Sequence, residues 1–159
     1  MKIEYSSIGI IHTPFTESEG VPIQPNAGKN ITGTVEIFPE FSSGLKDLDG
    51  FSHIYLIYHF HRSRRHPLSV IPFLDTVERG TFSTRAPNRP NLIGISIVKL
   101  EKVDRNLLHI RNVDILDGTP LLDIKPYIPE LEPEEIRIGW LEEKTFSDKK
   151  ADARFSEDD

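Results

Sequence analysis

The sequence predicts a mainly β fold, an antiparallel β-barrel with short helical turns in a single domain. Short runs rich in Ile, Val, Phe and Tyr recur along the 159 residues, and turn residues such as Thr13-Pro14 and Asp117-Gly118 bound most of them. The sequence shows neither an internal repeat nor the strand–helix alternation of a parallel sheet. A chain of this length buries a substantial core, so one domain is expected over residues 1–144.

The expected elements follow from composition and turn signals. The runs with the composition of strands are Ser7 to Ile11, Ile31 to Phe38, Phe51 to His61, Ile93 to Leu100, Leu107 to Ile115 and Glu135 to Leu141. Asp104-Arg105-Asn106 lies between two apolar runs and predicts a hairpin loop. Gly44 to Asp49 resembles a short helix, and Pro133-Glu134-Glu135 predicts the start of a single turn. Residues 145–159 are charged and nearly free of apolar side chains, which predicts a flexible tail.

The run from Ile54 to His61 is apolar on both alternating faces until it reaches His59 and His61. Such a strand suits a barrel wall that presents ligand-binding groups at the mouth of the barrel. The two histidines share one face with a spacing that a metal ion accepts, but no third ligand is near them in sequence. We therefore expect no metal site and interpret the pair as pocket-lining or packed histidines.

Composition excludes several classes of protein. The chain has no cysteine, which excludes disulfides, thiolate metal sites and cysteine nucleophiles. It lacks a GxSxG nucleophile elbow, a GxGxxG run and a P-loop, so neither a serine hydrolase nor a Rossmann-type cofactor site is expected. It also lacks an apolar run long enough for a membrane span and a basic, then apolar N-terminus. We expect a soluble, cytoplasmic protein without a membrane partner.

Positive charge is concentrated in the middle of an acidic chain. The formal net charge is −6, yet residues 61–112 hold 10 basic and 4 acidic side chains, a net of +6. Part of this charge lies in Arg62, Arg64 and Arg65, and part in Arg85 and Arg89. Such a patch attracts phosphate even on an acidic protein, although a solvated charged loop has the same composition.

The most distinctive stretch is Phe82 to Gly94, FSTRAPNRPNLIG. Pro87 and Pro90 restrict the backbone, so Arg85 and Arg89 lose little conformational entropy when they bind a ligand. Guanidinium groups suit planar, bidentate contacts to carboxylates and phosphates. The alternative is a surface turn whose arginines pair with local acids.

A second distinctive stretch runs from Asp117 to Pro129, DGTPLLDIKPYIP. Its Asp-Gly-Thr-Pro start predicts a tight turn, which serves either to read the polar edge of a nucleobase with backbone groups or only to connect strands. Asp123 and Lys125 share one face, as an ion pair or as part of a pocket wall. A third segment, Pro22-Ile23-Gln24, is extended and rigid and is by itself only a loop.

Taken in order, PIQP, FSH…YHFHRS, FSTRAPNRPNLIG and DGTPLLDIKPYIP resemble the TrmO (TsaA-like) family, S-adenosylmethionine-dependent tRNA methyltransferases built on a β-barrel. The resemblance covers about Ile8 to Tyr127. It implies methyl transfer to N6 of N6-threonylcarbamoyladenosine, next to the anticodon of tRNA, by a homodimer with its site near the subunit interface. By motif position, the cofactor contacts implied are Pro22, Ile23, Gln24, His61, Arg62, Arg85, Ile95, Asp117, Gly118, Thr119 and Pro120.

Two departures from the family pattern accompany the resemblance. Pro22-Ile23-Gln24 stands where the family often has Pro-Arg-Gln, which removes one charged contact. Many members also carry a C-terminal domain that helps to hold tRNA, whereas this chain ends in a short charged tail, so the docking of tRNA stays open.

The reaction implied by the resemblance suggests further roles. An N6 that carries a carbamoyl group is a poor nucleophile, so a base that removes its proton would help. The candidates are Asp117, Asp123, Tyr127 and His59, and the sequence does not choose among them. We assign Arg85 or Arg89 to the threonyl carboxylate, and Arg64 and Arg65 to backbone phosphates. The alternatives are a non-enzymatic sensor barrel that binds S-adenosylmethionine or a nucleotide, and a methyltransferase for another adenosine-containing molecule.

Overall fold

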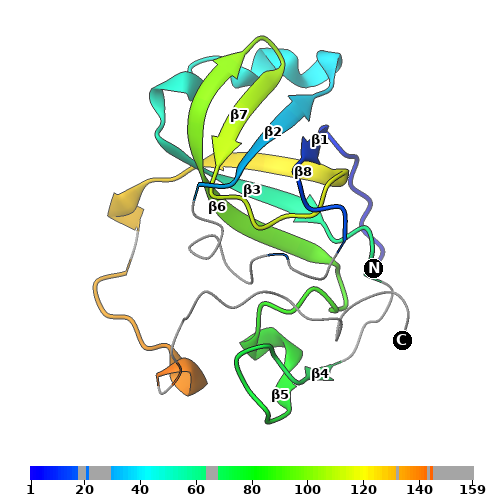
Figure 1. Cartoon of the computed structure of the whole chain (residues 1–159), viewed down its shortest axis with the longest axis vertical. Helices are drawn as coiled ribbons and strands as arrows, with labels where there is room; N and C mark the ends of the chain where they lie inside the picture. Colours follow the sequence, from blue (N-terminus) through cyan, green and yellow to red (C-terminus); the bar gives the residue numbers. More distant parts are fainter. Residues whose placement is uncertain (18–20, 22–29, 64–67, 132, 143, 145–159) are drawn as a thin grey trace.

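The structure, a computed structural model, describes residues 1–17, 21, 30–63, 68–131, 133–142 and 144. Its centre is a closed barrel of antiparallel strands in the order β1-β2-β7-β6-β3-β8, which confirms the predicted fold class (Figure 1). The barrel strands are β1 (Gly9–His12), β2 (Thr32–Ile37), β3 (His53–His59), β6 (Ile93–Asp104), β7 (Leu107–Arg111) and β8 (Thr119–Pro126). The predicted tail, residues 145–159, lies outside the described residues.

Alternation of side chains across each strand builds the core. In β3, Ile54, Leu56 and Tyr58 point inward and are at most 5% exposed. They meet inward residues of β6 such as Val98, which is fully buried. This period of two is the pattern from which strands are predicted, because successive side chains of a strand point to opposite faces.

The structure corrects the predicted strands in two places. Glu135 to Leu141 contains no strand and instead ends in a 3-10 turn, η5 (Gly139–Leu141). Conversely, Thr119–Pro126 forms β8, which closes the barrel by pairing with both β1 and β3. Its two prolines lack the N–H that a strand donates to its neighbour, and this hid the strand in the sequence. The register of β3 against β8 shifts between Ile57 and Tyr58, close to the end of the barrel that carries the candidate site.

The remaining elements are short. The Gly44 to Asp49 region belongs to two 3-10 turns, η1 (Pro39–Leu45) and η2 (Leu48–Gly50), rather than to one helix. The predicted hairpin loop at residues 104–106 is confirmed between β6 and β7, with Arg105 at φ 58°. Among the described residues there is no helix with the length and apolar composition of a membrane span.

A lobe outside the barrel, residues 68–83, lies beyond the end of β3 and β6 that is drawn lower in Figure 1. It contains β4 (Ser69–Val70), β5 (Arg79–Gly80), which pairs with β4, and the 3-10 turn η3 (Thr81–Ser83). This lobe and the turn η5 face the end of the barrel where the arginine-rich stretch, which starts in η3, enters β6. A site can therefore form between the barrel end and the lobe.

Candidate active site

A cavity of about 470 Å³ lies between the barrel end and the lobe. The barrel contributes the end of β3, the start of β6 and the residues after β7, and the lobe contributes Phe73 and Phe82. Trp140 and Leu141 of η5 complete the wall. Its volume lies in the range of sites for small molecules, roughly 300–1,000 Å³.

The cavity brings together residues that were predicted from separate motifs. Those that line it are His61, Arg62, Arg85, Arg89, Ile95 and Thr119. Asp117, Gly118 and Pro120 lie on the adjoining turn and strand and are not part of the wall. Pro22, Ile23, Gln24, Arg64 and Arg65 lie outside the described residues.

Both arginines of the arginine-rich stretch donate hydrogen bonds to backbone carbonyls. Arg85 donates from Nη2 to the carbonyl of Ile95 at 2.5 Å, which ties the loop to β6. Arg89 donates from Nη2 to the carbonyls of Thr81 and Thr84, both at 3.3 Å. A guanidinium has five N–H donors, so these contacts orient both groups at the cavity and leave Arg85 donors to offer a ligand.

His61 and Thr119 meet at the cavity wall. The Nδ1 atom of His61 lies 3.3 Å from the Thr119 hydroxyl, which also donates to the carbonyl of Leu116 at 2.7 Å. His61 therefore lines the pocket, while its predicted companion His59 does not. Within the described part of the chain, no three His, Cys, Asp or Glu side chains gather as a metal site would require.

None of the four candidate bases lines the cavity. Asp117 accepts a hydrogen bond from the Thr13 N–H at 3.0 Å, and its side chain is 40% exposed. Asp123 forms an exposed ion pair with Lys125 at 2.9 Å, so of the two predicted alternatives the structure shows the ion pair and not the wall of this cavity. The Tyr127 ring packs against His53 and Tyr55 near the opposite end of β3.

The acid that does line the cavity is Asp114, which sequence reasoning missed. Ser96 donates its hydroxyl proton to Asp114 Oδ1 at 2.6 Å, and the Tyr58 hydroxyl lies 3.1 Å from Ser96 Oγ. Burial raises the pKa of Asp114 to about 6, against the opposing effects of the Ser96 hydrogen bond and of Arg85. Burial, together with the charge of Asp114, also raises the pKa of Tyr58. The available signal was an acid placed between Val113 and Ile115 in an otherwise apolar run.

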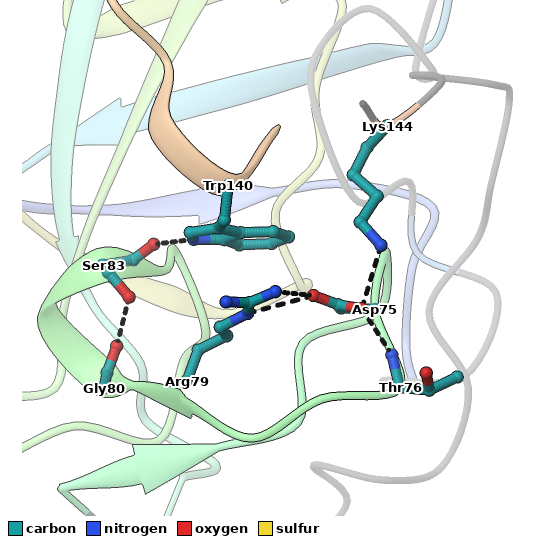
Figure 2. A network of polar contacts seen from close by, with 7 residues as sticks. All are labelled: Asp75, Thr76, Arg79, Gly80, Ser83, Trp140 and Lys144. Carbon is teal, nitrogen blue, oxygen red and sulfur yellow. Dashed lines mark hydrogen bonds and ion pairs between the residues drawn. The ribbon is translucent and has the colours of Figure 1, made fainter. Parts of the chain in front are cut away.

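A second polar cluster holds the outer wall of the cavity in place (Figure 2). Asp75, whose side chain is 2% exposed, accepts two hydrogen bonds from Arg79, at 2.8 and 3.0 Å, and one from Lys144 at 2.9 Å. The Lys144 bond, followed by Arg79, holds the pKa of Asp75 well below its usual range. Trp140 covers the Arg79 guanidinium at 5.2 Å and donates from Nε1 to the Ser83 carbonyl at 2.9 Å. These contacts fix η5 to the lobe, and we call them the Asp75 cluster.

Comparison with known proteins identifies the family of this chain. Residues 10–132 match the model of the tRNA-methyltransferase O N-terminal domain. The chain belongs to this family. A Pyrococcus abyssi relative, named "Probable S-adenosyl-L-methionine-binding protein", is 58% identical over 158 residues, which is 98% of this chain and 86% of that protein. A tRNA (adenine(37)-N6)-methyltransferase of Mus musculus is 34% identical over 139 residues, 82% of this chain and 32% of the mouse protein.

The family is also represented among solved structures. The crystal structure of TrmO from Pseudomonas aeruginosa matches with a TM-score of 0.74 and 36% identity, over 88% of this chain and 63% of that one. The chain thus spans under two thirds of this solved relative and about a third of the mouse protein.

Proposed function

We propose that this protein transfers a methyl group from S-adenosylmethionine to N6 of N6-threonylcarbamoyladenosine in tRNA, in the cytoplasm. Family membership and the mouse relative, named for N6 of adenine 37, support the reaction class. The observation that carries the proposal is the cavity, because it gathers the arginine-rich loop, the His61-Arg62 segment and Thr119 at one end of the barrel.

The cavity has the chemistry that S-adenosylmethionine requires. Its guanidinium groups at Arg62 and Arg85 suit the carboxylate of the methionyl part, and its aromatic wall suits the adenine ring. Phe82 lines the cavity and is 78% exposed, as expected for a ring that a ligand covers. When bound, S-adenosylmethionine supplies an activated methyl group on a sulfonium.

The threonyl carboxylate distinguishes the modified base from plain adenosine. An arginine fork forms two parallel hydrogen bonds with a carboxylate, and both Arg85 and Arg89 line the cavity. We assign one of these two groups to the substrate. Phosphates of the tRNA backbone would meet Arg64 and Arg65, which follow the cavity-lining Arg62 in sequence.

An apolar strip on the outside of the barrel supports a homodimer. Ile93, Ile95 and Ile97 of β6 are 39%, 44% and 36% exposed, and they pair across the sheet with His59, Ile57 and Tyr55 of β3. Exposed apolar patches of this kind mark contact surfaces. Since Ile93 and Ile95 also line the cavity, a second copy on this strip would sit next to the site.

The test has two stages. Addition of S-adenosylmethionine should raise the thermal unfolding temperature, because a ligand that binds only the folded state stabilises it. Incubation with tRNA that carries N6-threonylcarbamoyladenosine should then yield its N6-methyl derivative, detected by mass analysis of the nucleosides. Unmodified tRNA is the matched control. No thermal shift would refute the methyltransferase, and a shift without product would favour the sensor barrel.

A further inference from the structure

We propose that Asp114 is the catalytic residue that accepts the N6 proton during methyl transfer, and that Ser96 and Tyr58 position it. This inference rests on the proposed function and assigns the base that the sequence left open. Three features of the site support the assignment: a carboxylate in the cavity, a directed chain of hydrogen bonds and the charges around them.

The composition of the cavity wall singles out Asp114. Among the described residues, it is the one carboxylate that lines the cavity, whose other charged groups are the cations Arg62, Arg85 and Arg89. A proton acceptor must lie within reach of the reacting atom, and geometry comes before pKa in the choice of a base. Asp117 and Asp123 point elsewhere and are 40% and 46% exposed at their side chains.

The hydrogen-bond chain has one direction. A serine hydroxyl has a single proton, and Ser96 donates it to Asp114 Oδ1. Ser96 Oγ therefore accepts from the Tyr58 hydroxyl, so both protons point toward the carboxylate. Tyr58 and Ser96 are 5% and 1% exposed and lie on adjacent strands of the barrel, where Tyr58 pairs with Gly94 and Leu56 with Ser96. Asp114 follows β7 and is thus anchored at the cavity wall by its hydrogen bond to Ser96 of the sheet.

The charges around Asp114 leave it ionised at neutral pH and able to accept a proton. Burial raises its pKa to about 6, while Ser96 and Arg85 favour the charged form. Tyr58 stays protonated because burial raises its pKa, so it acts only as a donor. His61, Arg62 and Arg89 line the same cavity. A base whose pKa lies just below the working pH combines a high ionised fraction with useful basicity.

The step balances as follows. The N6 nitrogen forms a bond to the methyl carbon, while the carbon–sulfur bond breaks and its electron pair goes to sulfur. As the new bond forms, positive charge grows on N6 and its proton becomes strongly acidic. This proton passes to the Asp114 carboxylate and is then released to solvent. A carboxylate is therefore basic enough at that point, although it would not deprotonate the free carbamoylated amine.

The first test is Asp114→Asn, which keeps the size and the acceptor for Ser96 but removes the base. We expect kcat with modified tRNA to fall at least about 100-fold, as is typical for loss of a general base. The dissociation constant for S-adenosylmethionine, measured by calorimetry, should change less than about 3-fold. Asp49→Asn, at an exposed position of η2, is the matched control. Unchanged kcat, or a large loss of cofactor affinity that accounts for the whole effect, would overturn the assignment.

The second test is the pH profile of kcat, which a merely structural role would not move. The wild type should lose activity as pH falls through about 6, because Asp114 becomes protonated. Ser96→Ala removes the hydrogen bond that favours the charged form, so its acidic limb should move to higher pH. An unmoved limb in a folded Ser96→Ala variant would refute the positioning role. A wild-type chain without product would instead refute the proposed function itself, whereas product with a fully active Asp114→Asn variant refutes only this inference.

Discussion

Gly94 offers the sharpest test of how the barrel supports the site. A Cβ at this position would overlap the Tyr58 ring, 2.5 Å from its Cζ, and would lie 2.9 Å from Phe60 Cζ. Both distances are far below van der Waals contact, so Gly94→Ala must displace the Tyr58 ring. That ring is 5% exposed, packs edge-on against Phe60 and bonds to Ser96, so it has little room to move.

The expected loss combines two effects. Overpacking of a buried position costs about 1–3 kcal/mol, and loss of the Tyr58–Ser96 hydrogen bond costs about 1 kcal/mol. The free energy of unfolding should therefore fall by about 2–4 kcal/mol, which corresponds to a fall in Tm of roughly 5–15 °C for a chain of this size.

Urea denaturation followed by circular dichroism measures this change directly. Gly50→Ala is the matched control, because a Cβ there meets nothing within 4 Å. We expect the control to stay within about 0.5 kcal/mol of the wild type. Equal stability of Gly94→Ala and Gly50→Ala would show that the Tyr58 ring is free to shift, and would weaken the argument that it positions Asp114.

Three further predictions concern binding and assembly. Neutralising Arg64 and Arg65 together to Gln should weaken tRNA binding and reduce its log–log salt slope by about 1–2, measured by filter binding at several salt concentrations; an unchanged slope would place tRNA elsewhere. Ile97→Lys should convert the proposed homodimer into monomers in light scattering, while Thr32→Lys on β2 should not; a dimer that persists in Ile97→Lys would remove the apolar strip as its interface. Trp140→Ala should raise the dissociation constant for S-adenosylmethionine about 10-fold in calorimetry, the size of one lost stacking contact; unchanged affinity would leave Trp140 a structural role only.

Strands in which inward and outward residues alternate regularly could be predicted from the sequence. Segments that become strands only when neighbouring strands pair with them could not. β3 alternates strictly and β6 does so from Ile93 to Leu100, so their inward residues follow from the pattern. Ile136 and Ile138 alternate in the same way, yet they are 66% and 45% exposed and lie in no strand, because no neighbouring strand pairs with them. β8 forms despite its prolines because β1 and β3 flank it on both sides.

In the candidate site, too, local features could be predicted from the sequence and long-range contacts could not. Arg85 and Arg89 could be predicted because their chemistry is local to a proline-braced stretch. Asp114 could not, because its role depends on Ser96 and Tyr58, which lie 18 and 56 residues earlier in the chain and meet it only through the barrel. Sequence motifs thus indicated the groups proposed for binding, while the group proposed for the chemistry emerged from the fold.

The Asp75 cluster has a consequence for how activity data are interpreted. A carboxyl whose pKa is depressed on folding contributes stability above its unfolded pKa and loses it only as pH falls through the lower folded value. Since Lys144 and Arg79 hold the pKa of Asp75 well below its usual range, η5 stays fastened to the lobe throughout mild acid. A titration near pH 6 therefore changes the charge inside the cavity while its outer wall keeps its shape. The pH profile then reports on groups inside the cavity rather than on loss of its outer wall.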